Sequence, residues 1–213
     1  MKINNERNLT ETRESRYTYL TELIKENNCK VILETGTWKG KNSVKMIQEA
    51  LNHSDKKDVR YYGFDVWEQM TKELFEKEYS KWPPQKNVVS NLLGKTGAEV
   101  NLIQGNTVST LPKFVEGFED ALDFVYIDGG HSFETIDNDW NNISKIVSEN
   151  TVVVFDDYYV MNDGSQPVNG CSKLISEIEE DKHWDVEILP GYEQEKTWDK
   201  KIYFVKVTKS KEV

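Results

Sequence analysis

The segment 121–131, ALDFVYIDGGH, joins an apolar run to an acid, two glycines and an imidazole. Asp128 directly follows the apolar residues, and His131 comes three positions later. An imidazole has a pKa near neutrality, so it can act as a general base or orient a substrate hydroxyl. These residue types at this spacing predict a catalytic pair. The alternative is that His131 is an exposed residue after a turn.

A second apolar run, 151–159 (TVVVFDDYY), ends in the acids Asp156 and Asp157. With Asp128 they make three carboxylates, hard oxygen ligands that prefer Mg²⁺, Mn²⁺ or Ca²⁺ to zinc. Carboxylates gathered without a cation repel one another and raise one another's pKa values, so a bound metal is the simplest explanation. In the alternative, Asp156 pairs with a lysine and Asp157 caps the next segment.

Strands are needed to bring these acids together. Residues 124–127 and 151–155 are aromatic or β-branched, which is typical of strands buried on both faces of a parallel sheet. Shorter apolar runs at 31–33, 60–67 and 101–104 alternate with helical patterns. Ligands of doubly wound α/β proteins bind where the carboxyl ends of such strands meet. The pattern therefore predicts a Rossmann-like α/β fold with its site at that edge.

The C-terminal part of the chain has a different pattern. Residues 184–189 and 201–208 alternate apolar and polar side chains around the turn-rich segment 190–199, which predicts an antiparallel hairpin. Five β–α units and this hairpin give a seven-stranded, mostly parallel sheet with helices on both faces. We expect residues 1–213 to form one domain.

Two segments lie outside this regular pattern. Residues 1–12 are polar, and we expect them to be flexible. Residues 69–100 are long, charged and irregular, so we interpret them as an insertion or lid. The same insertion is a candidate contact of a homodimer.

Composition excludes several classes of partner. The formal net charge of −10 argues against nucleic acid, because no basic stripe is present to neutralise phosphates. No apolar run approaches the roughly 18 residues of a membrane span, and the N-terminus does not resemble a secretory signal. Cys29 and Cys171 are far apart and match no metal-binding spacing, which favours reduced thiols and a cytoplasmic location.

A glycine-containing loop, Glu34-x-Gly36-x-x-x-Gly40, follows the first predicted strand. Its glycines allow a tight turn and close approach to a ligand. It lacks the third glycine of the dinucleotide fingerprint, which argues against a nicotinamide oxidoreductase. Asp65 ends the second predicted strand, where an acid can accept both hydroxyls of a ribose. A ligand-free turn and a solvated acid are the alternatives.

Five motifs occur in order: VILETGTWKG, GFDVWE, LIQGNT, FVYIDGGHSFE and VVVFDDY. This series resembles class I S-adenosylmethionine-dependent methyltransferases. More narrowly, it resembles metal-dependent small and sugar O-methyltransferases of the macrocin O-methyltransferase type. The resemblance spans residues 31–208. It implies S-adenosylmethionine and Mg²⁺ (or Mn²⁺ or Ca²⁺) as cofactors, and a hydroxyl of a sugar or diol-bearing natural product as methyl acceptor.

The resemblance also implies a role for each predicted loop. The loop after the first strand would bind the methionyl part of the cofactor, the second strand would hold the ribose, and the third loop would flank the adenine. The acid after the fourth strand would lie beneath the sulfonium and face the acceptor. The residues so assigned are Glu34, Gly36, Thr37, Gly40, Ser43, Asp65, Asn106, Thr107 and Asp128.

These assignments predict a mechanism. A metal held by Asp128, Asp156 and Asp157 would chelate two neighbouring acceptor oxygens and lower the pKa of the reacting hydroxyl. His131 would accept the proton. Two alternatives are a methyltransferase that needs no metal or acts on nitrogen, and a methyltransferase-like binding protein without turnover.

Overall fold

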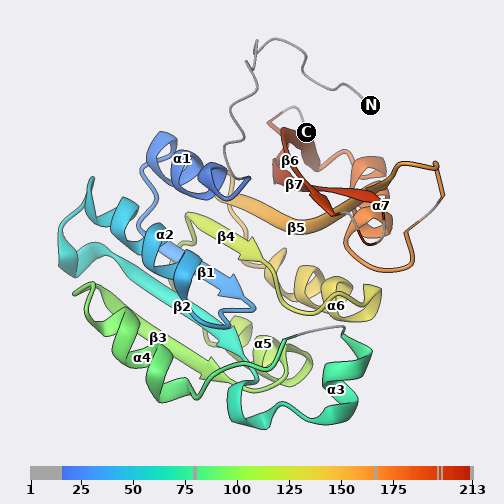
Figure 1. Cartoon of the computed structure of the whole chain (residues 1–213). Coiled ribbons are helices and arrows are strands. Elements are labelled where there is room, and N and C mark those ends of the chain that lie inside the picture. Colours follow the sequence, from blue (N-terminus) through green and yellow to red (C-terminus); the bar gives the residue numbers. More distant parts are fainter. Residues whose placement is uncertain (1–15, 79–80, 166, 196, 198, 212–213) are drawn as a thin grey trace.

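The computed structural model describes residues 16–78, 81–165, 167–195, 197 and 199–211. One seven-stranded sheet in the order β3-β2-β1-β4-β5-β7-β6 forms the centre of the molecule (Figure 1). Strands β1 to β5 are parallel, and β7 is antiparallel to both β5 and β6. The predicted fold is therefore confirmed. Residues 1–12, predicted to be flexible, lie outside the described residues.

The strands carry the apolar runs recognised in the sequence. They are β1 Val31–Thr35, β2 Arg60–Asp65, β3 Glu99–Gln104, β4 Phe124–Ile127, β5 Val152–Met161, β6 Trp184–Glu195 and β7 Lys200–Lys209. All residues of β1 and β4 are buried, because they lie in the middle of the sheet with helices on both sides.

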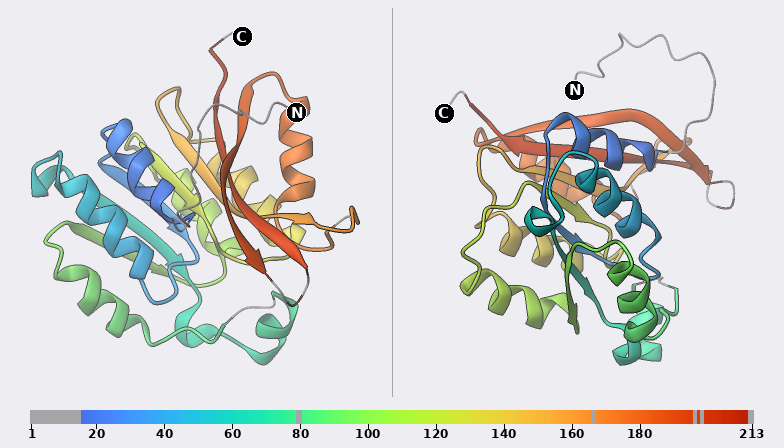
Figure 2. Two further views of the ribbon diagram at one scale, coloured as in Figure 1. Left: turned by 45° about the horizontal axis from the view of Figure 1, so that its top comes forward. Right: turned by 90° about the vertical axis from the view of Figure 1, so that its left-hand side faces the viewer.

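Helices cover the sheet in two layers (Figures 1 and 2). They are α1 Thr18–Glu26, α2 Lys41–Leu51, α3 Lys72–Lys77, α4 Lys86–Gly94, α5 Thr107–Glu116, α6 Phe133–Ile143 and α7 Ser172–Glu180, with short 3₁₀ turns at Lys56–Asp58 and Trp67–Gln69. Apolar side chains of α1, α2 and α4 form the core on one face, and those of α5, α6 and α7 form the core on the other. No helix in the described part of the chain combines the length and hydropathy that a membrane crossing requires.

The predicted insertion at 69–100 contains two different elements. Helix α4 is a regular crossover helix, because Val89 and Leu93 are fully buried against the core beside α2. Helix α3 has no buried residue and projects from the lower edge of the molecule in Figure 1. The additional element is thus confined to the part of the segment that precedes α4.

Two strands continue beyond the ends that the sequence predicted. Strand β5 passes through Asp156 and Asp157, where its register with β7 shifts and Asp157 takes a φ of 59°. Strand β6 passes through Pro190 and Gly191, with a second register shift against β7. Pairing with β7 sustains both strands across residues that break their apolar patterns.

Candidate active site

A cavity of about 440 Å³ lies at the carboxyl edge of the parallel strands. This volume is within the range of roughly 300–1,000 Å³ that is usual for small-molecule sites. Residues that follow four neighbouring strands contribute to its wall: Gly36, Asp65, Asn106 and Asp128. Parallel strands end at a common edge, which explains why residues so far apart in the sequence converge here.

Gly36 occupies the closest approach between the loops after β1 and β4. Its φ is +84°, and a Cβ at this position would lie 1.8 Å from the carbonyl oxygen of Asp128. Only glycine allows both this conformation and this contact. Gly40, with a φ of 70°, is instead the N-cap of α2 and is not among the residues lining the cavity.

Glu34, Thr37 and Ser43 form a buried network with Tyr61 outside the cavity wall. Ser43 donates a hydrogen bond to Glu34 at 2.5 Å, and the Tyr61 hydroxyl donates to the same carboxylate. Thr37 Oγ1 lies 3.2 Å from the Tyr61 hydroxyl. Burial raises the pKa of Glu34 to about 7, although both hydrogen bonds to it lower that pKa. This network supports the loop that contains Gly36, and the cofactor contact of these three residues stays a prediction.

Asp65 lines the cavity and is oriented by backbone groups. Its carboxylate accepts hydrogen bonds from the N–H of Trp38 at 2.6 Å and of Trp67 at 3.2 Å. Burial raises the pKa of Asp65, while these hydrogen bonds lower it. Asn106 and Thr107 also line the cavity, and the Asn106 side chain caps α5 by accepting from the backbone of that helix.

The three predicted metal-binding aspartates all line the cavity. Asp156 Oδ1 accepts a hydrogen bond from Arg16 Nη1 and another, at 2.6 Å, from the backbone N–H of Asp157. Its second oxygen accepts from the Tyr126 hydroxyl at 2.7 Å. A carboxylate has about four lone-pair sites, so most of those on Asp156 are already occupied.

His131 also lies in the cavity wall, between two hydrogen-bond acceptors. Its Nε2 is 2.9 Å from Asp157 Oδ2, and its Nδ1 is 2.6 Å from the carbonyl oxygen of Glu78. Burial lowers the pKa of His131, but the hydrogen bond and charge of Asp157 outweigh it and raise the pKa to about 9. A ring that donates from both nitrogens is already protonated, which opposes its predicted role as general base.

Glu78 joins the α3 segment to the loop after β4. Its carboxylate accepts hydrogen bonds from the backbone and side chain of Ser132, both at 2.9 Å, and from Thr135 at 2.8 Å. These groups belong to the first turn of α6, where an acid is favourable. A Cβ on Gly130 would lie 2.4 Å from Glu78 Oε2. The segment before α4 is thus fastened directly to the loop that carries His131.

Two side-chain cations compensate the negative charge of the acidic cluster formed by Asp128, Asp156 and Asp157. Arg16 pairs with Asp156, and His131 pairs with Asp157. Among the described residues, no three acidic, histidine or cysteine side chains are placed to hold one metal ion. The predicted metal site of Asp128, Asp156 and Asp157 therefore stays a prediction, and two of its three aspartates already pair with Arg16 and His131.

Asp128 is the member of the cluster that forms no ion pair among the described residues. Burial raises its pKa well above the usual value, and the charges of Asp156, Asp157 and Glu34 raise it further. A carboxylate with a raised pKa is a stronger base than an ordinary aspartate. The surroundings of Asp128 therefore favour its neutral form, and a positive charge bound beside it would favour the ionised form.

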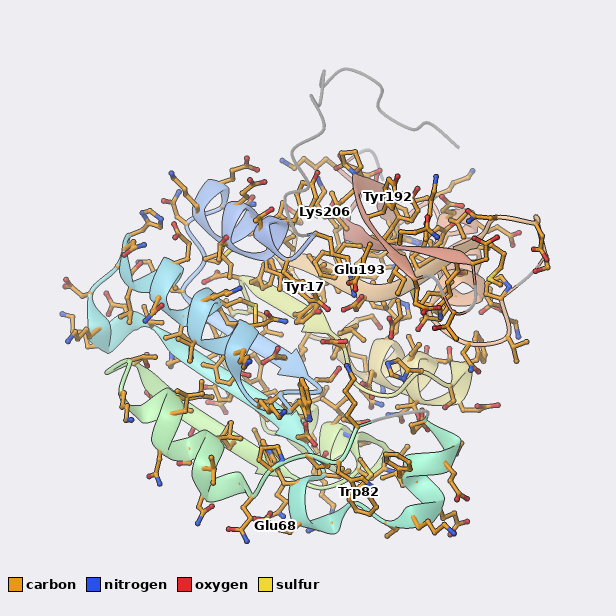
Figure 3. All side chains as sticks on the ribbon, viewed as in Figure 1. Tyr17, Glu68, Trp82, Tyr192, Glu193 and Lys206 are labelled. Carbon is orange, nitrogen blue, oxygen red and sulfur yellow. The ribbon has the colours of Figure 1, made fainter. Side chains whose placement is uncertain are left out.

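Several residues of the site carry no local signal in the sequence. Arg16 belongs to a polar N-terminal segment, and Tyr17 follows the apolar pattern of the first helix. Glu193 lies in a segment predicted to be a turn, yet Arg16 Nε is 3.4 Å from its carboxylate across 177 residues of sequence. Figure 3 shows Tyr17 and Glu193 close together, although they come from opposite ends of the chain.

Comparisons with known proteins agree with this arrangement. The family model described as "Methyltransferase domain" matches residues 33–158. An O-methyltransferase from Streptomyces achromogenes, TomG, has a TM-score of 0.68 at 16% identity, covering 95% of this chain and 84% of that one. An O-methyltransferase from Bacillus cereus has a TM-score of 0.67 at 14% identity, covering 93% and 84%. An uncharacterized protein of Acanthamoeba polyphaga mimivirus is 22% identical over 160 residues, 65% of this chain and 69% of that protein.

The sheet order and the site at its carboxyl edge define an α/β protein of the class I methyltransferase fold. The chain belongs to the methyltransferase domain family, since the matched residues cover more than half of it. The resemblance stated from the five sequence motifs is thereby confirmed.

Proposed function

We propose that this protein transfers the methyl group of S-adenosylmethionine to a hydroxyl oxygen of a small molecule. The observation that carries the proposal is the cavity at the carboxyl edge of β1, β2 and β4, whose wall includes Gly36, Asp65 and Asp128. These residues all lie within the part of the chain that matches the methyltransferase family. The TomG structure contains S-adenosylmethionine and the Bacillus cereus structure its demethylated product, which supports the same cofactor here.

The residues at one end of the cavity suit such a cofactor. Gly36 lines the cavity where the methionyl part would lie, and the oriented carboxylate of Asp65 can accept the ribose hydroxyls. Asn106 and Thr107 would flank the adenine. When bound, the sulfonium supplies an electrophilic methyl group.

Asp128 would accept the proton of the acceptor hydroxyl. As the oxygen–methyl bond forms, the sulfur–methyl bond breaks, and S-adenosylhomocysteine leaves with the electron pair on sulfur. An ionised Asp128 would stabilise a cationic sulfonium beside it, and that positive charge would in turn oppose the burial and the neighbouring acids that raise the pKa of Asp128. His131 would position Asp157 and the loop after β4 rather than take the proton.

The acceptor is the least constrained part of the proposal. A sugar or diol-bearing natural product is the acceptor class that the sequence motifs favour. Of the alternatives, oxygen transfer without a metal fits best, because Arg16 and His131 occupy the oxygens that a metal would need. A nitrogen acceptor would use the same cofactor-binding residues.

Calorimetric titration of S-adenosylhomocysteine into chelator-treated protein, without and with Mg²⁺, tests the cofactor. We expect micromolar affinity in both conditions and a loss of roughly tenfold or more for Asp65→Asn, since a buried hydrogen-bonding partner would be weakened. Asp120→Asn is the matched control, because Asp120 pairs with Arg60 outside the cavity. No binding to the wild-type protein would refute the proposal.

Asp128→Asn tests the proton acceptor. The amide keeps the size of the side chain but cannot take a proton, so we expect methyl transfer to fall about 10²–10⁴-fold while S-adenosylhomocysteine affinity stays within a few-fold. The measurement is product formation from S-adenosylmethionine and a panel of sugars and catechols. Undiminished turnover in the variant would assign the proton to another group.

A further inference from the structure

We infer that Arg16 is the resident cation beside Asp128, Asp156 and Asp157. Its guanidinium binds Asp156 in the place of the predicted divalent ion. On this basis the site needs no metal. Methyl transfer without a metal, the catalytic consequence, rests on the proposed function. The part that concerns metal binding stands on the contacts of Arg16 alone.

The guanidinium of Arg16 has a partner for each of its three nitrogens. Nη1 donates to Asp156 Oδ1, Nη2 donates to the Tyr17 hydroxyl at 3.0 Å, and Nε is 3.4 Å from Glu193 Oε2. The carbon at its centre lies 4.6 Å from the centroid of the Tyr17 ring and 4.7 Å from that of Phe204. A guanidinium is planar, so it stacks on aromatic rings and donates several hydrogen bonds in fixed directions better than any other side-chain cation.

Arg16 is held by several parts of the fold at once. Asp156 belongs to β5, Glu193 to β6 and Phe204 to β7, so three strands contact one side chain. Arg16 is only 5% exposed, yet it is among the residues that line the cavity. A buried, multiply bonded cation at a cavity wall is a built feature of the site rather than a passing surface pair.

The electrostatic consequence concerns all three aspartates. Asp156 pairs with Arg16 and Asp157 with His131, which leaves Asp128 as the one of these three aspartates without an ion pair among the described residues. A divalent ion entering the cluster would meet the guanidinium at close range, and like charges repel. Arg16 is thus a positioning residue that fixes Asp156 and keeps the site closed to metal.

Titration with Mn²⁺, followed by electron paramagnetic resonance, tests this inference in the full chain. We expect the wild-type protein and Arg16→Lys, which keeps the charge, to leave Mn²⁺ free at concentrations up to about a millimolar. We expect Arg16→Gln to gain one site that binds at least about tenfold tighter, because the guanidinium no longer repels the ion. Arg60→Gln is the matched control, since it removes an arginine–aspartate pair outside the cavity.

Folding and cofactor binding are checked separately for each variant by circular dichroism and S-adenosylhomocysteine titration. One tight Mn²⁺ site in the wild-type protein, or no gain of affinity in folded Arg16→Gln, would overturn the inference. If Arg16→Gln does not fold, the wild-type and Arg16→Lys titrations decide it, since Mn²⁺ binding by either contradicts it and absence in both supports it. A failure of S-adenosylhomocysteine binding would instead refute the proposed function and leave the Mn²⁺ result intact.

Discussion

The two ring nitrogens of His131 face a carboxylate of Asp157 and a backbone carbonyl of Glu78. Both partners accept hydrogen bonds, so the ring is stabilised in its protonated form. This environment favours the positively charged form of an imidazole that the sequence marks as a base. A histidine at such a position acts through the groups that it holds.

The His131–Asp157 pair gives a prediction about pH and stability. The pKa of His131 is about 9 in the folded protein against 6.5 for the unperturbed group, so its contribution is complete below about pH 6.5 and is lost as the pH rises through 9. A shift of this size corresponds to at most roughly 3 kcal/mol of free energy of unfolding. Urea denaturation between pH 6 and 10 should therefore show a steeper loss of stability for the wild-type protein than for His131→Gln.

His183→Gln serves as the control for that experiment. His183 also lies 2.6 Å from an aspartate, Asp181, but its side chain is 69% exposed. Comparing variants removes the contribution of other groups that titrate in this range, such as Glu34. Equal pH slopes for wild-type protein and His131→Gln would contradict the protonated state of His131.

At the residue scale, the acids of the site could be predicted and its cations could not. Asp65 and Asp128 stand at the ends of buried strands, and such ends share one edge of a parallel sheet. Arg16 reaches Asp156 across 140 residues, a contact that no local pattern encodes. The metal prediction was made without this contact, because three carboxylates together call for a cation and the sequence does not show that arginine and histidine pair with two of them.

At the scale of elements, the loop after β1 is packed against the loop after β4 through Gly36. We expect Gly36→Ala to lower the free energy of unfolding by about 1–3 kcal/mol, because a Cβ requires both a strained φ and displacement of the Asp128 carbonyl. The same displacement should weaken S-adenosylhomocysteine binding. Thermal unfolding measures the loss of stability, and calorimetry measures the loss of affinity.

Gly94→Ala is the matched control for this substitution. Gly94 ends α4, and a Cβ there would have no neighbour within 4 Å. Alanine is therefore expected to be neutral or slightly stabilising at that position. If Gly36→Ala behaved like Gly94→Ala in both assays, the contact between the two loops would not be important for the site.

Strand ends were harder to predict than strand cores. The apolar run of β5 stops before Asp156, but the strand continues to Met161 because β7 pairs with it on both sides of a register shift. A register shift increases local twist and re-aims side chains. The register shift thus turns Asp156 and Asp157 toward the cavity. In the sequence it is visible only as two consecutive acids.

At the scale of the whole molecule, the alternation of buried runs and amphipathic helices was sufficient to predict the class of fold. The central strands consist almost entirely of buried side chains, and each side of the sheet has its own set of helices. The position of β7 between β5 and β6 could not be predicted, because hairpin patterns do not say which strand pairs with the sheet. The homodimer and the cytoplasmic location stay predictions.

The wall of the cavity combines residues of the family-matched stretch with residues outside it. Gly36, Asp65 and Asp128 belong to the stretch that matches the family, whereas Arg16 and Glu193 lie before and after it. Substitutions at Arg16 or Glu193 can therefore change this wall while Gly36, Asp65 and Asp128 stay in place. Variation confined to such outer segments is a route by which proteins that share this domain can differ in the molecules that their cavities admit.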